Sequence, residues 1–169
     1  MIKVYRWNTG RRDGQWVDPE VLRTDAAGLK ESGDIVWVDL ESPTTEEEQL
    51  VFCTFFRIHS LSLEDTTFER RHPEALAPHL PKVEEFPDYL FVIVNPLNPV
   101  LVDEATDQSE ILRRRMRVTT QLSAVMTRCM LITYHSAPLK SIADLRGYLG
   151  RHEACAERGP DFLFHLVLD

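Results

Sequence analysis

The sequence has no hydrophobic run long enough to cross a membrane. Its longest uninterrupted apolar stretch, YLFVIV, occupies residues 89–94, whereas a membrane-spanning helix needs ~18 or more apolar residues. We therefore expect no membrane span within these 169 residues.

Basic residues are outnumbered by acidic ones, which argues against a nucleic-acid-binding surface. The chain has 19 Lys and Arg residues against 27 Asp and Glu residues, a formal charge of -8, and contacts with phosphates need a basic face. One basic cluster contains Arg113, Arg114, Arg115 and Arg117, but the acidic segment beside it favours a solvated, charge-balanced hairpin tip. We expect cations or neutral molecules as partners, and no nucleic acid.

Cysteine is scarce. Cys53, Cys129 and Cys155 are widely spaced, and no two of them form a CxxC pair. An odd number of cysteines without a secretory leader predicts a reduced cytoplasmic setting with no disulfide. Cys53 lies within an apolar helical pattern, so we interpret it as a small core residue rather than as a nucleophile.

The common motifs of enzymes and zinc sites are also missing. GxSxG, GxxxxGKS/T and GxGxxG do not occur, which argues against the usual hydrolase and nucleotide-binding sites. The six histidines never adopt HxxxH or HExxH spacing, so no two of them are expected to share a helical face as zinc ligands.

The composition is that of one ordinary globular domain. Hydrophobic residues make up 43% of the chain and charged residues 27%, within the usual range of folded proteins. A chain of 169 residues can bury about two-thirds of the surface that its unfolded form exposes. We therefore treat residues 1–169 as a single domain.

The first part of the chain alternates between strand and helix patterns. Residues 2–7 and 34–40 are typical of strands, with a loop-rich connection between them. A helix is then predicted, capped by Ser42 or Thr44, and a short second helix at residues 61–65. The buried stripe of the first helix is expected to contain Leu50, Phe52, Phe55 and Phe56.

The second part predicts two strand pairs and two helices. The strands are expected at residues 80–86, 88–94, 118–127 and 129–135. The helices are expected at residues 138–152 and 159–169. One face of the first helix contains Leu139, Ile142, Leu145 and Leu149. The second helix has no glycine, asparagine or basic residue to end it, so we expect the chain to stop within that element.

Two adjacent carboxylates, Glu64 and Asp65, lie at the end of the short second helix. They fit a solvated helix end, a general acid and base, or oxygen ligands of a metal ion. Catalytic acids need a cleft that gives them different environments. Mg2+ needs only one or two carboxylates because it keeps several of its waters. Residue spacing alone leaves all three interpretations open.

Five segments carry a resemblance to a known family. They are WVDL at 37–40, RIHSLSLED at 57–65, PKVEEFPDYLFVIV at 81–94, TTQLSAVMTRCMLITYH at 119–135 and GPDFLFHLVLD at 159–169. In this order they resemble the amino-terminal cytoplasmic domain of CorA-type divalent-cation transporters. The chain departs from the family pattern in a longer segment after Asp65 and in Leu80, where arginine is common.

The resemblance implies an α/β fold, with three α/β/α layers around a mixed central β-sheet. It also implies that residues 1–169 form the single cytoplasmic regulatory domain of a CorA-like transporter, cut before a stalk helix and the membrane spans. The full-length protein is then expected to be a homopentamer at the cytoplasmic face of the inner membrane, held there by downstream segments.

The metal ligands that the resemblance implies are Asp65, Glu64 and Asp169, at the boundary between neighbouring subunits. The expected ion is regulatory Mg2+, bound weakly by this chain alone, with Co2+ as a further candidate. Bound Mg2+ would gate ion transport, so no catalytic residue is assigned. The alternatives are a zinc-transporting relative of the same architecture, a stand-alone hydrolase using Glu64 and Asp65, and an interaction module whose acids are only solvated.

Overall fold

One seven-stranded mixed β-sheet forms the centre of the computed structural model, which describes residues 1–73, 75, 78–97 and 119–169. The strand order across the sheet is β2, β1, β3, β7, β6, β5, β4. The strands are β1 Ile2–Asn8, β2 Asp13–Val17, β3 Ile35–Glu41, β4 Lys82–Glu85, β5 Leu90–Val94, β6 Leu122–Met126 and β7 Met130–His135.

Strands β3 and β7 run parallel to each other at the centre of the sheet, and the other neighbouring strands pair antiparallel. Both are almost completely buried, as expected of strands covered on two faces. Asp39 in β3 and Thr133 and His135 in β7 are also buried. These two strands therefore carry polar side chains into the interior.

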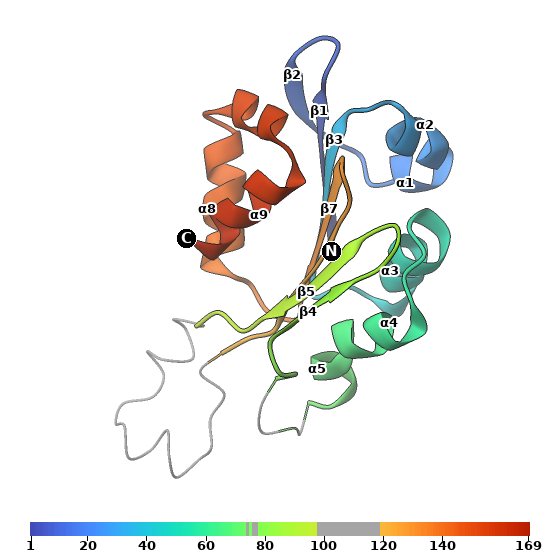
Figure 1. The fold of residues 1–169 in the computed structure, drawn as a ribbon, viewed down its shortest axis with the longest axis vertical. Helices are drawn as coiled ribbons and strands as arrows, with labels where there is room; N and C mark the ends of the chain where they lie inside the picture. Colours follow the sequence, from blue (N-terminus) through green and yellow to red (C-terminus); the bar gives the residue numbers. More distant parts are fainter. Residues whose placement is uncertain (74, 76–77, 98–118) are drawn as a thin grey trace.

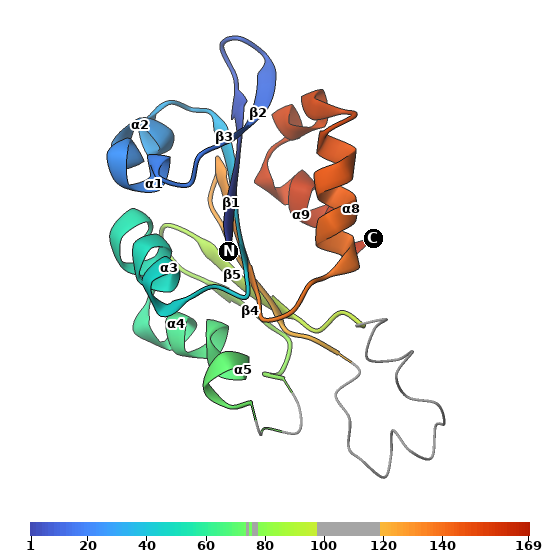
Figure 2. The same cartoon turned by 180° about the vertical axis from the view of Figure 1, so that it is seen from behind.

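Helices cover both faces of the sheet (Figure 1). One face carries α1 Val21–Thr24, α2 Ala26–Glu31, α3 Thr45–Gln49, the π-helix η1 Leu50–Phe55, α4 Ser60–Thr66 and α5 Phe68–Arg71. The other face carries α8 Lys140–Leu149, the 3-10 helix η2 Glu153–Arg158 and α9 Pro160–Leu168, as the opposite view also shows (Figure 2). The predicted three-layer α/β/α fold with a mixed sheet is confirmed.

Each face of the sheet has its own buried apolar cluster. Val38, Phe52 and Phe91 belong to the cluster beneath the first set of helices, and Trp37 and Leu163 to the cluster beneath α8 and α9. The predicted apolar face is confirmed, since the N-cap residue Leu139 and three residues of α8 are buried: Ile142, Leu145 and Leu149. Burial of each such side chain contributes about 1.5–3 kcal/mol.

Helix α3 begins at a capping box, and its cap is Thr44 rather than Ser42. The amide of Glu47 donates to Thr44 Oγ1 at 3.3 Å, while the amide of Thr44 donates to Glu47 Oε2 at 2.8 Å. These bonds satisfy two amides that the helix itself leaves without partners. The local sequence thus determines where helix α3 begins on this face of the sheet.

The prediction that Cys53 is a core residue is wrong, because its side chain is exposed. The helix continues from α3 as the π-helix η1, in which Leu50, Phe52 and Phe55 turn toward the sheet as predicted. Cys53 lies between these inward positions and faces solvent.

The connection between β1 and β3 is more ordered than predicted. It contains β2 and the short helices α1 and α2. Strand β2 is an edge strand with no fully buried residue, so its sequence lacks the apolar alternation that marks a half-buried strand. The two helices bury one leucine each, Leu22 and Leu29.

The arginine-rich stretch at 113–117, interpreted as a hairpin tip, lies outside the described residues. Among the residues that are described, no helix has the length and apolar character to span a membrane.

Candidate functional site

Asp65 lies near the end of α4, one of the predicted elements. The helix starts after His59, whose Nδ1 accepts a hydrogen bond from the amide of Leu61 at 3.3 Å. The last residues of α4 turn toward the sheet, so that Thr66 is buried while Asp65 is partly buried and Glu64 is exposed. The side chain of Asp65 keeps 18% of its surface exposed, which leaves its carboxylate accessible from one side.

Each oxygen of the Asp65 carboxylate has a protein partner. Lys82 Nζ donates to Oδ2 at 2.5 Å, and His79 Nε2 lies 3.1 Å from Oδ1. Lys82 Nζ also donates to Glu84 Oε1 at 3.0 Å, so the amine bridges two carboxylates. Asp65 is therefore already paired in the described chain.

The backbone of Asp65 is held by the buried side chain of Gln121, just before β6. Gln121 Nε2 donates to the carbonyl oxygen of Asp65 at 2.7 Å and to Ser123 Oγ at 2.9 Å. The backbone amide of Gln121 donates to Glu69 Oε1 at 3.1 Å. Because these bonds join α4 and α5 to the sheet, the position of Asp65 depends on the core and not on a free loop.

Two opposing effects act on the pKa of Lys82. Its partial burial disfavours the charged amine, but the hydrogen bonds and charges of Asp65 and Glu84 outweigh burial and raise the pKa of Lys82 above its usual value. The amine also lies 5.5 Å from the centre of the Phe91 ring, within the range of a cation–π contact. Lys82 is therefore a fixed positive charge beside Asp65 at neutral pH.

A surface hollow of about 520 Å³ opens beside this pair. It is lined by His59, Leu61, Asp65, Lys82, Glu84, Glu85 and Phe86. Three carboxylates line the hollow, and two of them, those of Asp65 and Glu84, bind the Lys82 amine. Carboxylate oxygens are the ligands that Mg2+ prefers. A hydrated cation of moderate size could enter from solvent.

The other two predicted ligands are exposed and lie apart. Glu64 is exposed on α4, whereas Asp169 follows α9 on the opposite face of the sheet (Figures 1 and 2). The side chain of Asp169 is 70% exposed and lies 3.4 Å from His165 Nε2. One chain therefore brings Glu64 and Asp65 to the same helix but does not bring Asp169 to them.

A second cluster of metal-ligating residue types lies inside the sheet and was missed from the sequence. Ligand atoms of Asp39, Glu41 and His135 lie within 4.8 Å of one another. Glu41 is paired with His135 across the parallel strands β3 and β7. Short-range spacing does not reveal this cluster, because His135 lies far along the chain from Asp39 and Glu41. The available signal was the presence of charged residues in otherwise apolar strands.

This second cluster already contains a cation, the guanidinium of Arg146 from α8. Arg146 donates to Asp39 Oδ2 and, at 3.2 Å, to Glu41 Oε2. Thr133 Oγ1 and His135 Nε2 contact Asp39 Oδ1 at 2.5 and 3.2 Å. Burial alone would raise the pKa of Asp39, but these hydrogen bonds and the charges of His135 and Arg146 hold it below its usual value. The arrangement is a compensated ionic network and not an open metal site.

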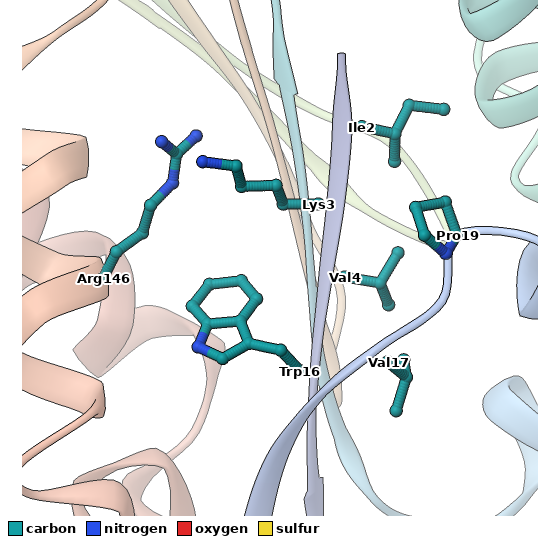
Figure 3. A pocket seen from close by; sticks show the side chains of 7 residues that line it. All are labelled: Ile2, Lys3, Val4, Trp16, Val17, Pro19 and Arg146. Carbon is teal, nitrogen blue, oxygen red and sulfur yellow. The ribbon is translucent and has the colours of Figure 1, made fainter.

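Arg146 also borders a hollow of about 410 Å³ beside β1. Figure 3 shows Lys3, Trp16 and Arg146 on one side of β1, with Ile2, Val17 and Pro19 on the other. No acidic residue lines this hollow, so it offers no carboxylate to a divalent cation. The carboxylates at Asp65 remain the best candidate metal centre among the described residues.

The comparisons with known proteins agree with this architecture. The family model described as "CorA-like Mg2+ transporter protein" matches residues 32–169. A search of curated protein sequences finds no match. The chain is similar to the CorA magnesium transporter from Methanocaldococcus jannaschii, with 19% identity and a TM-score of 0.66 over 99% of this chain and 43% of that chain.

Two further solved structures have a similar fold. The full-length CmaX protein is 16% identical, with a TM-score of 0.59 over 98% of this chain and 43% of that chain. The ZntB cytoplasmic domain from Vibrio parahaemolyticus RIMD 2210633 is 8% identical, with a TM-score of 0.59 over 99% of this chain and 56% of that chain. The chain thus spans less than half the length of the matched CorA and CmaX chains.

Proposed function

This chain belongs to the CorA-like Mg2+ transporter family, and we propose that it is a regulatory domain that senses magnesium and gates such a transporter. The family is one of transporters and not of enzymes. The hydrolase alternative, which used Glu64 and Asp65 as catalytic acids, is therefore set aside. The family match is the observation that carries the proposal.

In this proposal residues 1–169 are the single cytoplasmic domain of a longer protein. A stalk helix and membrane spans follow it, and the full-length protein is a homopentamer at the cytoplasmic face of the inner membrane. Support comes from the relative lengths, since this chain covers only 43% of the matched CorA transporter chain. The ions carried are Mg2+ and Co2+.

The regulatory ion binds between neighbouring copies, with Glu64 and Asp65 from one copy and Asp169 from the next. Glu64 and Asp169 are exposed on opposite faces of one chain, which is the arrangement that side-by-side copies need in order to join them. Mg2+ keeps several waters and is bound through few carboxylates. This chain alone should therefore bind Mg2+ only in the millimolar range.

Bound Mg2+ favours the closed state by screening acids of adjacent copies. Two like charges ~4 Å apart repel by ~1 kcal/mol in water and ~4 kcal/mol near a protein surface. Repetition at each subunit boundary of an oligomer gives a total of several kcal/mol, which is comparable to known allosteric couplings. Loss of the ion restores the repulsion and favours opening.

Replacement of Asp65 by alanine in the full-length protein tests this function. Uptake of Mg2+ is measured in vesicles while the internal Mg2+ concentration is raised. We expect Asp65→Ala to shift the shut-off to at least about tenfold higher Mg2+, since a ligand of the regulatory ion is lost. Glu31→Ala, at the exposed end of α2, is the matched control. Shut-off at the wild-type concentration in Asp65→Ala would contradict the proposal.

A second candidate function is zinc transport, favoured by the similarity to the ZntB cytoplasmic domain. The same sensing domain would then serve a different pore. Uptake of Zn2+, Mg2+ and Co2+ by the full-length protein separates the two, because only the zinc candidate predicts that Zn2+ is carried in preference to Mg2+.

A further inference from the structure

We propose that Lys82 is a built-in competitor of Mg2+ for Asp65, an ammonium group that occupies the carboxylate whenever the ion is absent. The inference rests on the proposed function and adds to it a residue that sets the concentration at which the sensor responds. It follows from contacts within the described chain and involves no residue of a neighbouring copy.

The contacts place Lys82 where a cation would bind. Lys82 Nζ lies 2.5 Å from Asp65 Oδ2 and 3.0 Å from Glu84 Oε1. Its side chain is 24% exposed, and it lines the same hollow as both carboxylates. A divalent ion that approaches Asp65 from solvent therefore meets an amine already bound to the carboxylate.

Electrostatics prevents both cations from occupying this position together. A magnesium ion coordinated to a carboxylate oxygen lies ~2.1 Å from it, so an amine bound to that oxygen would face a doubly charged ion at close range. Two unit charges ~4 Å apart near a protein surface already repel by ~4 kcal/mol. Direct binding of Mg2+ to Asp65 Oδ2 thus requires Lys82 to leave that oxygen.

Lys82 has a second carboxylate partner, which allows its amine to leave Asp65 Oδ2. Glu84 lies two residues further along β4, so its side chain projects from the same face of the strand as that of Lys82. The lysine stem is flexible and its amine can rotate among acceptors. When Mg2+ binds Asp65, the amine can keep its hydrogen bond to Glu84 and its contact with the Phe91 ring.

The competition changes the ion-free state of the sensor. Without Lys82, Oδ2 of the partly buried Asp65 carboxylate would lack its ammonium partner, while Oδ1 would keep its contact with His79. With Lys82, the carboxylate is neutralised in the absence of the ion, and Mg2+ must displace the amine before it binds. The lysine therefore moves the response to higher Mg2+ concentration.

Three variants of the 169-residue chain test this inference, with Mg2+ binding measured by calorimetric titration with MgCl2 at constant ionic strength. Lys82→Met keeps the stem but removes the charge, and should tighten Mg2+ binding by about fivefold, the scale of a removed partly exposed ion pair. Lys82→Arg should bind Mg2+ as weakly as the wild type or more weakly, since guanidinium holds carboxylates in two-pronged contacts. Lys140→Met, an exposed position on α8, carries the same change in net charge and should leave binding unchanged.

Tighter Mg2+ binding by Lys82→Met, with no tightening in Lys82→Arg, would support competition, because a merely structural role of Lys82 would weaken Mg2+ binding in both variants. Equal or weaker Mg2+ binding by Lys82→Met, with thermal stability retained, would overturn the inference. Asp65→Asn separates this failure from failure of the proposed function. If Asp65→Asn abolishes binding while Lys82→Met changes nothing, the sensor stands without the competitor. If Asp65→Asn binds Mg2+ like the wild type, both proposals fall.

Discussion

At the scale of single residues, stability depends on how Arg146 compensates buried charge. The side chain of Asp39 is 0% exposed, and Arg146 contacts both it and Glu41. Without the guanidinium, two carboxylates would remain close together at the sheet. Removal of one partner of a buried ion pair is strongly destabilising because the other charge is left uncompensated.

Arg146→Met should therefore lower the free energy of unfolding by about 3 kcal/mol at neutral pH, as measured by urea denaturation. Arg151→Met, at an exposed position just after α8, is the control and should change it by less than about 0.5 kcal/mol.

The effect of Arg146→Met should also depend on pH. The folded chain lowers the pKa of Asp39, so the stabilisation by this carboxylate is present above its unfolded pKa of ~3.9 and is lost as the pH falls through the folded value. The difference between wild type and Arg146→Met should narrow below about pH 4. An equal difference at every pH would contradict this account of the network.

The sequence alone predicted part of the site at Asp65 and none of the buried cluster at Asp39. Glu64 and Asp65 are adjacent, so their pairing on one helix could be predicted. Lys82 and His79, the spatial partners of Asp65, lie further along the chain, after α5, and no periodicity relates them to α4. The buried cluster of Asp39 and His135 depends on the parallel pairing of β3 with β7, which is a property of the tertiary fold.

At the scale of secondary-structure elements, the sequence predicts those with strong local signals. The central strands and α8 have dense apolar patterns, and the start of α3 has a capping motif. Strand β2 and helices α1 and α2 were missed because they are short and bury few side chains. Such elements form where the rest of the fold gives them a surface to pack against.

Thr44→Ala tests the capping motif of α3. Loss of the Thr44 Oγ1 acceptor leaves the amide of Glu47 without its side-chain partner, and the free energy of unfolding should fall by about 1 kcal/mol. Thr45→Ala is the matched control, since the neighbouring threonine is exposed and follows the cap. An equal decrease in the free energy of unfolding in the two variants, measured by urea denaturation, would show that the cap has no special role.

At the scale of the whole molecule, the sheet separates the predicted ligands. Helix α4 with Asp65 lies in one outer layer, and α9 with Asp169 lies in the other (Figure 1). A single copy therefore holds two halves of the proposed site on opposite faces. Copies arranged side by side would complete the site at each boundary, so that ion binding and assembly would depend on each other.

Disulfide cross-linking between copies tests this central claim most directly. Asp65→Cys and Asp169→Cys are made separately in the full-length protein, with the exposed Cys53 replaced by serine, and the two are expressed together and oxidised. The account predicts cross-linked dimers when both variants are present and none with either variant alone. Absence of cross-linked dimers from the mixture, in protein that still assembles and transports Mg2+, would contradict the placement of Asp65 at the boundary between copies.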